Sequence, residues 1–160
     1  MPDFSVLGTN HTGITVSNLD RAVAFYSNVL GFTLRDRGPR DPAFIEQVVA
    51  VPGADVEIAY MTAPGHTLEL IEYRGPAGRG AVRPRPSDTG ATHIAFNVDA
   101  IEAVVTAVRA AGFTVLSDPL QVTAGPNAGA KVVYTQDPDG VTLEFIQPPP
   151  RPASAPGTEA

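Results

Sequence analysis

The sequence contains no cysteine among its 160 residues. Disulfide bonds and thiolate chemistry are therefore excluded, and a metal ion could be held only by histidine and carboxylate side chains. No run of lysine or arginine is interleaved with aromatic residues, and the formal net charge is −6. This charge balance argues against nucleic acid or an anionic membrane surface as a partner.

Long apolar runs are also missing. No segment is long enough to span a bilayer, and the first residues, MPDFSVLGTN, lack a basic region followed by an apolar run. We therefore expect a cytoplasmic protein. The hydrophobic content of 43% is enough for one domain with a real core, or for two small halves packed side by side.

What the sequence does contain is a long internal repeat. HTGITVSNLDRAVAFYSNVLGFTL begins at His11, and HIAFNVDAIEAVVTAVRAAGFTVL begins at His93. Both copies have a histidine, an apolar strand, a short turn, an amphipathic helix, Gly-Phe-Thr and a second strand. A strand with Glu69 follows in the first copy and one with Glu144 in the second. The pattern predicts an α+β fold of two paired βαβββ modules.

The repeat also suggests where the parts of the chain begin and end. We predict a first module over residues 1–73 and a second over residues 92–147, joined by a linker over residues 74–91. Residues 148–160 are rich in proline and have almost nothing to bury, so they are expected to be a disordered tail.

Short polar residues and glycines mark the expected helices. Asn18 or Asp20 could cap the first helix, because a short side chain there can accept from free backbone N–H groups, and Gly31 would end it. In the second copy Asp99 would open a helix and Gly112 would close it.

Each copy contributes one histidine at the start of its first strand and one glutamate in its last strand. A lone strand histidine is more often a structural group than a ligand, and a glutamate among apolar residues can simply face solvent. Two matched pairs at equivalent places in a duplication favour a shared metal cleft instead. A divalent cation removes the cost of burying the carboxylates. Two imidazoles and two carboxylates suit Zn, Ni, Co, Mn or Fe.

The segments HTGITVSNLDRAVAFYSNVLGF, HIAFNV and DPDGVTLEFIQ resemble the vicinal oxygen chelate superfamily, which includes glyoxalase I, methylmalonyl-CoA epimerase, extradiol dioxygenases, fosfomycin-resistance enzymes and cyclitol epimerases. The resemblance covers residues 7–147. It implies one domain in which the paired modules form a half-open mixed sheet around a single metal ion, and it implies a homodimer. The ligands that it implies are His11, Glu69, His93 and Glu144.

The four-ligand set favours a metal-dependent epimerase or isomerase. Proton transfer next to a carbonyl of a small keto or cyclic polyol substrate would use Glu69 or Glu144 as the base. Thr15 and Tyr73 stand where glyoxalase I carries the Arg and Asn that hold glutathione, which argues against glutathione here. Three alternatives stay open: a glyoxalase-type lyase, an Fe(II) extradiol dioxygenase that leaves one glutamate unbound, and a non-catalytic drug-binding resistance protein.

Three side chains share the inward parity of the ligands on their strands, and we predict that they contact substrate: Thr15, Tyr73 and Asn97. The alternative for Tyr73 is core packing, and for the other two it is hydrogen bonding along the strands.

Other glutamates and the third histidine are weaker candidates for a role in the reaction. Glu72 lies an odd step from Glu69 and is expected to face solvent, and Glu57 has the same ambiguity. Glu46 is expected in a mobile segment over the cleft, and His66 in a surface turn. The linker arginines are either solvated or form a clamp for a substrate anion.

Overall fold

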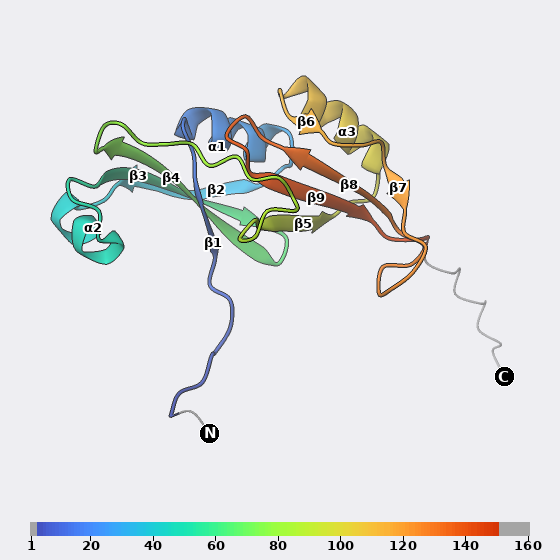
Figure 1. The fold of residues 1–160 in the computed structure, drawn as a ribbon, viewed down its shortest axis with the longest axis horizontal. Helices are drawn as coiled ribbons and strands as arrows, with labels where there is room; N and C mark the ends of the chain where they lie inside the picture. The colour runs from blue at the N-terminus through green and yellow to red at the C-terminus, as the bar shows by residue number, and fades with distance from the viewer. Residues whose placement is uncertain (1–2, 151–160) are drawn as a thin grey trace. The chain divides into compact units, whose positions relative to one another are not determined.

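The computed structural model describes residues 3–150. The chain forms two compact units, one within residues 1–82 and the other within residues 83–160 (Figure 1). No helix within residues 3–150 is long and apolar enough to cross a membrane. The predicted tail lies outside the described residues from residue 151 onward.

The first unit is a four-stranded mixed sheet in the order β1-β4-β3-β2. β1 pairs parallel with β4, and the remaining pairs are antiparallel. The elements are β1 (Thr12–Thr15), α1 (Leu19–Asn28), β2 (Thr33–Pro39), α2 (Pro42–Val49), β3 (Asp55–Ala63) and β4 (His66–Gly75).

The second unit repeats this plan in a five-stranded sheet. Its strand order is β5-β9-β8-β6, and β7 pairs with β8 as well. The parallel pair is now β5 with β9, the counterpart of β1 with β4. The elements are β5 (His93–Asn97), α3 (Ile101–Ala110), β6 (Thr114–Val115), β7 (Leu120–Gln121), β8 (Lys131–Gln136) and β9 (Thr142–Gln147). The predicted α+β fold with two βαβββ modules is confirmed.

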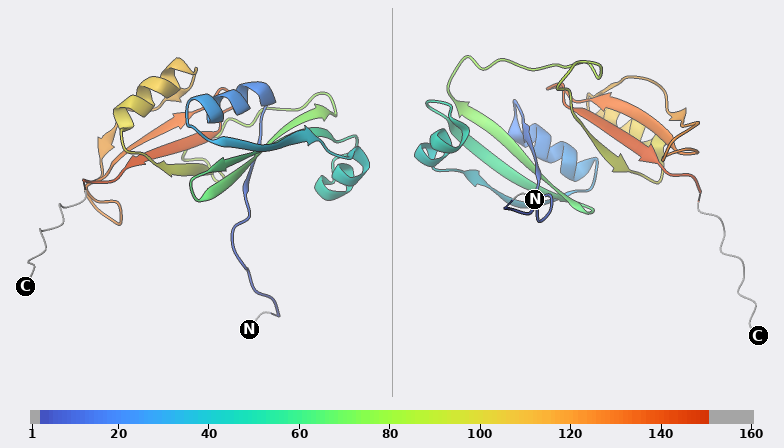
Figure 2. Two further views of the ribbon diagram at one scale, coloured as in Figure 1. Left: turned by 180° about the vertical axis from the view of Figure 1, so that it is seen from behind. Right: turned by 60° about the horizontal axis from the view of Figure 1, so that its bottom comes forward.

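One face of each sheet is buried by a helix. Leu68 and Leu70 of β4 are fully buried on the face that α1 covers, and in the second unit Leu143 and Phe145 of β9 are also fully buried. Figure 2 shows α1 along one side of the four-stranded sheet. Because side chains alternate along a strand, Glu69 lies on the opposite face of its sheet, which α1 does not cover.

The first backbone N–H of each main helix, α1 and α3, donates to a side chain on the last strand of the same unit, and in α1 a residue just before the helix adds a second cap. Asn18 accepts from the backbone N–H of Arg21 at 2.8 Å, which confirms Asn18 rather than Asp20 as the side-chain cap. The N–H of Leu19 donates to Glu72 Oε2 at 2.6 Å, so the expectation that Glu72 faces solvent was wrong. In α3 the N-cap is Ala100, not Asp99, and the N–H of Ile101 donates to Gln147 Oε1 at 2.8 Å.

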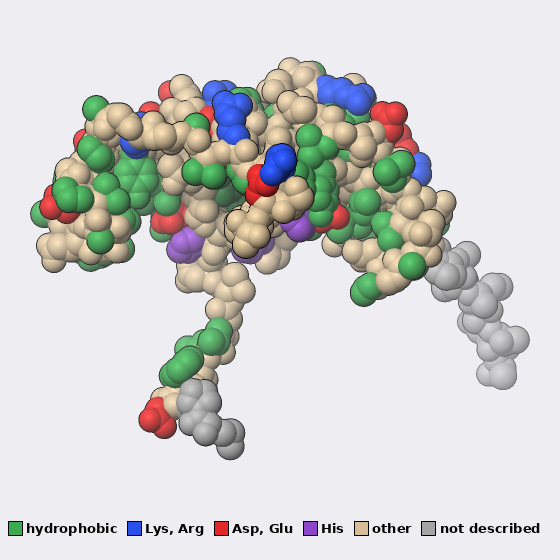
Figure 3. Space-filling model, viewed as in Figure 1, with side chains coloured by type: hydrophobic (Ala, Val, Ile, Leu, Met, Phe, Trp, Pro, Cys, Tyr) green, Lys and Arg blue, Asp and Glu red, His purple; other side chains and the backbone are tan. Residues whose placement is uncertain are grey.

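Helix α2 interrupts the first module between β2 and β3. It begins after Asp41, whose side chain accepts from the N–H of Phe44 at 2.9 Å, with Pro42 at its first position. Its one buried residue, Ile45, joins a hydrophobic cluster with Val56 and Ile58. The outer side of α2 leaves apolar side chains exposed (Figure 3). Glu46 therefore lies on a helix, where Glu46 Oε2 accepts from the N–H of Gly53 at 3.0 Å, and the mobility of this segment stays a prediction.

Candidate metal centre

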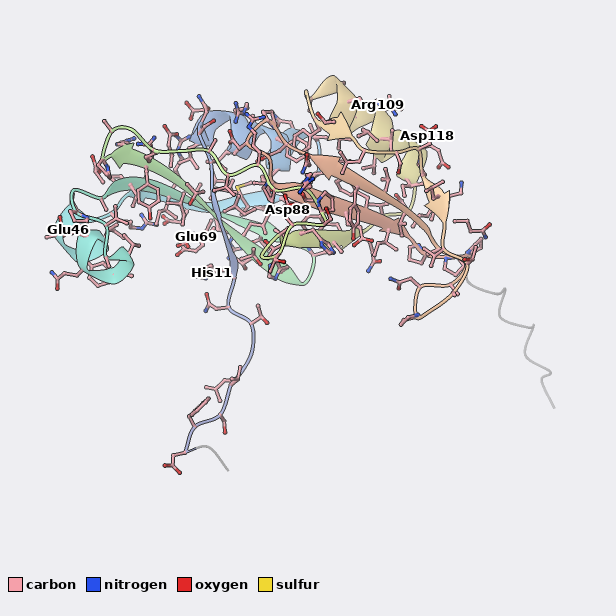
Figure 4. The ribbon with its side chains drawn as sticks, viewed as in Figure 1. His11, Glu46, Glu69, Asp88, Arg109 and Asp118 are labelled. Atoms are coloured by element: carbon pink, nitrogen blue, oxygen red, sulfur yellow. The ribbon has the colours of Figure 1, made fainter. Side chains whose placement is uncertain are left out.

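In the first unit, the two predicted ligands lie side by side at one edge of the sheet. His11 Nε2 is 3.1 Å from Glu69 Oε2. The parallel pairing of β1 with β4 produces this contact, because it sets Gly13 opposite Glu69 and brings the residue before β1 alongside the carboxylate. Figure 4 shows the two labelled side chains next to each other.

The orientation of His11 is fixed by its neighbour in the chain. His11 Nδ1 is 2.7 Å from Asn10 Oδ1. When Nδ1 carries the ring proton, it donates to Asn10 and the lone pair of Nε2 faces Glu69 Oε2. Two lone pairs at this separation repel each other, so a cation or a second proton between them makes the arrangement favourable. A divalent ion bound by both atoms is one way to satisfy this pair, and a ring proton on Nε2 is the other.

The second unit repeats the pair in the same register. His93 Nε2 is 3.1 Å from Glu144 Oε2. Parallel pairing of β5 with β9 sets Ala95 opposite Glu144, as Gly13 lies opposite Glu69 in the first unit. The glutamate side chains are only 14% and 13% exposed, whereas the histidines are 32% and 44% exposed. Each unit thus holds a sheltered carboxylate beside a more accessible imidazole.

A tyrosine stands directly opposite each glutamate on the neighbouring antiparallel strand. Tyr60 of β3 pairs with Glu69, and Tyr134 of β8 pairs with Glu144. The hydroxyl of Tyr60 donates to Glu69 Oε1, and this hydrogen bond, followed by burial, raises the pKa of Tyr60. Burial, followed by the charge of Glu144, raises the pKa of Tyr134. Sequence reasoning missed both tyrosines, although each lies in the strand before the glutamate-bearing one, nine residues before Glu69 and ten before Glu144.

The donor set in each unit fits a divalent cation. An imidazole nitrogen and a carboxylate oxygen suit Zn, Ni, Co, Mn or Fe. Within residues 3–150, no group of three or more histidine, aspartate and glutamate side chains lies close enough to hold a metal ion. What each unit provides by itself is a pair, so a single centre with four ligands stays a prediction.

The three predicted substrate contacts lie on the ligand-bearing faces. Thr15 pairs with Ile71 and is exposed, two residues beyond the position opposite Glu69. Tyr73 is partly buried against the cluster that contains Ile45. Asn97 is exposed and lines a cavity of about 480 Å³ in the second unit. Their contact with substrate stays a prediction.

Two other candidates have structural partners that explain them. Glu57 lies on the face opposite Glu69, and its carboxylate accepts from Arg37 and Arg74. These guanidinium groups, Arg37 first, lower the pKa of Glu57. His66 is not in a surface turn, because it begins β4, is partly buried and has its Nε2 2.8 Å from Thr12 Oγ1.

The arginines between the modules have local partners. Arg79 donates to the carbonyl of Pro76, Arg83 to the carbonyl of Pro138, and Arg85 pairs with Asp88. These contacts favour the solvated alternative over a clamp for a substrate anion.

Comparison with known proteins gives consistent matches. The chain matches the model of the Glyoxalase/Bleomycin resistance protein/Dioxygenase superfamily over residues 8–145. It is 36% identical over 148 residues to a 2-epi-5-epi-valiolone epimerase from Actinomyces sp, covering 89% of this chain and 80% of that protein. It is 32% identical over 139 residues to the lactoylglutathione lyase of Haemophilus influenzae, covering 86% and 90%.

A solved structure has the same fold. A glyoxalase family protein from Bacillus cereus matches with a TM-score of 0.82 at 22% identity, covering 94% of this chain and 99% of that chain. At 22% identity this match shows the fold alone.

Proposed function

Because the chain belongs to the Glyoxalase/Bleomycin resistance protein/Dioxygenase superfamily, we propose that it is a divalent-metal-dependent epimerase or isomerase of a small keto or cyclic polyol substrate. The resemblance to the vicinal oxygen chelate superfamily is confirmed by this membership. The relatives are epimerases and lactoylglutathione lyases, so the chain is an enzyme of the epimerase or lyase type.

The observation that carries the proposal is the repeated pair. Each unit holds a histidine nitrogen 3.1 Å from a glutamate oxygen, in equivalent registers of parallel strand pairs. Metal dependence is typical of the superfamily. The residues that would hold the ion are His11, Glu69, His93 and Glu144. When bound, a divalent ion supplies Lewis-acid stabilisation of the negative charge that develops on a carbonyl oxygen.

The chain's own side chains would move the proton. A carboxylate oxygen of Glu69 or Glu144 accepts the proton from the carbon next to the carbonyl, and the electron pair of that C–H bond moves toward the carbonyl oxygen. A second group on the opposite face, the other glutamate or a water molecule, then gives a proton to the carbon and inverts it, and the first carboxylate releases the proton that it accepted. Thr15, Tyr73 and Asn97 would orient the substrate.

A glyoxalase-type lyase is the second candidate, and the identity of 32% to the lactoylglutathione lyase of Haemophilus influenzae favours it. Against it stand Thr15 and Tyr73 at the positions expected to hold glutathione. Tyr73 also packs against a hydrophobic cluster, and neither residue carries a positive charge to pair with an anionic carrier. Both reactions transfer a proton next to a carbonyl. They differ in whether the substrate is attached to glutathione.

The test begins with the untagged protein purified without added metal. We expect about one equivalent of a divalent ion by mass spectrometry. The loaded protein in D₂O should incorporate deuterium next to the carbonyl of 2-epi-5-epi-valiolone or a similar cyclic ketone, and Glu69→Gln or Glu144→Gln should slow that exchange. Exchange only with a glutathione hemithioacetal would favour the lyase, and iron with oxygen uptake on a catechol would favour the dioxygenase. A protein that takes up no metal would overturn the proposal. A homodimer in the cytoplasm stays a prediction.

A further inference from the structure

We propose that Tyr60 is a positioning residue for Glu69, holding one carboxylate oxygen so that the other stays beside His11. This inference rests on the proposed metal centre and concerns a residue outside the four predicted ligands. The two oxygens of Glu69 have different partners, because Oε1 accepts from the hydroxyl of Tyr60 whereas Oε2 lies 3.1 Å from His11 Nε2. Glu69 is therefore arranged to offer a single oxygen to a cation.

The strand register places the hydroxyl of Tyr60 beside the carboxylate of Glu69. Tyr60 lies directly opposite Glu69 in the antiparallel pair β3–β4, and Asp36 of β2 lies opposite Tyr60 on its other side. The three side chains form one row across the sheet, on the face that α1 leaves uncovered. The row ends at Gly13 of β1, which has no side chain to crowd the carboxylate.

The ring of Tyr60 is held in turn by its surroundings. It packs against the cluster of Val56 and Ile58, and the guanidinium carbon of Arg40 lies 6.0 Å from its ring centroid. Arg40 also donates to Asp36 at 2.6 Å, and this ion pair favours a position of the guanidinium near the ring. The hydrogen bond from the hydroxyl favours one orientation of Glu69 before any ion binds, and this reduces the ordering cost of binding.

In the second unit Tyr134 also hydrogen-bonds to Glu144, but its hydroxyl lies near the histidine as well. The Tyr134 hydroxyl lies 3.5 Å from His93 Nε2, and the two rings are tilted by 39°. In the first unit the rings of Tyr60 and His11 meet edge to face at 85°, with the hydroxyl directed at the glutamate. The removal of the hydroxyl should therefore matter more at Tyr60 than at Tyr134.

The experiment measures metal affinity of the full chain, by titrating Co²⁺ or Zn²⁺ against a chromophoric chelator. Tyr60→Phe keeps the ring and removes only the hydroxyl, and we expect it to weaken binding by roughly tenfold to a hundredfold. Tyr26→Phe, which removes a hydroxyl on the α1 side of the sheet, is the matched control and should bind like the wild type. The visible spectrum of the Co²⁺ protein should change with Tyr60→Phe and not with Tyr26→Phe.

A double-mutant cycle tests whether Tyr60 acts through Glu69. In a Glu69→Ala background the further change Tyr60→Phe should have no effect on affinity, because the carboxylate it positions is gone. Equal affinity of wild type and Tyr60→Phe would overturn the inference while leaving the metal centre intact. The same loss in both backgrounds would also overturn it. If the wild-type protein binds neither ion, the proposed centre itself fails, and the inference fails with it.

Discussion

The backbone N–H of Leu19, the first residue of α1, donates to Glu72 Oε2 at 2.6 Å. Glu72 stands three residues beyond Glu69 on β4, so one strand both carries the candidate ligand and caps the helix behind it. The second unit uses the same relation, with Gln147 three residues beyond Glu144 and bound to the N–H of Ile101. An acceptor at a helix N-terminus satisfies a donor that the helix itself leaves free.

Loss of this cap should destabilise the first unit. We expect Glu72→Ala to reduce the free energy of unfolding by about 0.5–2 kcal/mol, as loss of a helix cap does. Glu72→Gln keeps a carbonyl oxygen in the same place and should lose less. Urea unfolding followed by circular dichroism gives both values. Equal losses for Ala and Gln would show that the charge of Glu72, rather than its acceptor, is what stabilises the helix.

The repeat was readable from the sequence because strand alternation, helix periodicity and Gly-Phe-Thr recur in the same order. Neighbours brought together by strand register were harder to predict. The residues next to Tyr60 and Glu72 in the sequence do not predict what these side chains bind. Tyr60 contacts Glu69 because of the register of β3 with β4. Glu72 contacts the N–H of Leu19 because α1 packs on the sheet. For α2 a local signal did exist, since Asp41 followed by Pro42 is a good helix start.

The acid sensitivity of the first unit should depend on Glu57. Its carboxylate accepts from Arg37 and Arg74, and Arg37 in particular holds the pKa of Glu57 below the ordinary value of 4.5. A depressed pKa in the folded state means that the ion pairs stabilise the fold above that ordinary value. This contribution is lost as the pH falls through the folded-state pKa.

Glu57→Gln tests this dependence. The mutant should be less stable than the wild type near neutral pH, and the difference should close as the pH falls below 4.5. Urea unfolding at several pH values between about 7 and 3 measures it. Asp118→Asn, whose side chain is 89% exposed, is the control and should show little difference at any pH. A constant gap for Glu57→Gln across that range would mean that packing, not ionisation, explains its role.

Attachment of α2 to the sheet should depend on one side chain. Ile45 is 8% exposed and packs with Val56 and Ile58, whereas Val48 on the same helix is 62% exposed. We expect Ile45→Ala to cost about 2–4 kcal/mol of unfolding free energy and Val48→Ala less than about 0.5 kcal/mol. Amide hydrogen exchange over residues 42–49 would show whether the helix opens in Ile45→Ala. Similar costs for both mutants would contradict the packing described for α2.

The histidines provide a matched pair for testing the candidate centre in the first unit. His11 has its Nε2 3.1 Å from Glu69 Oε2, whereas His66 has its Nε2 2.8 Å from Thr12 Oγ1 and lies on the other face of the sheet. Loss of an imidazole ligand removes a bond to the ion, so His11→Ala should strongly weaken metal binding. His66→Ala should lose only a hydrogen bond, about 0.5–1.5 kcal/mol of stability, and keep the metal. Calorimetric titration with Zn²⁺ measures both affinities. If His66→Ala lost binding while His11→Ala kept it, His66 rather than His11 would be the ligand.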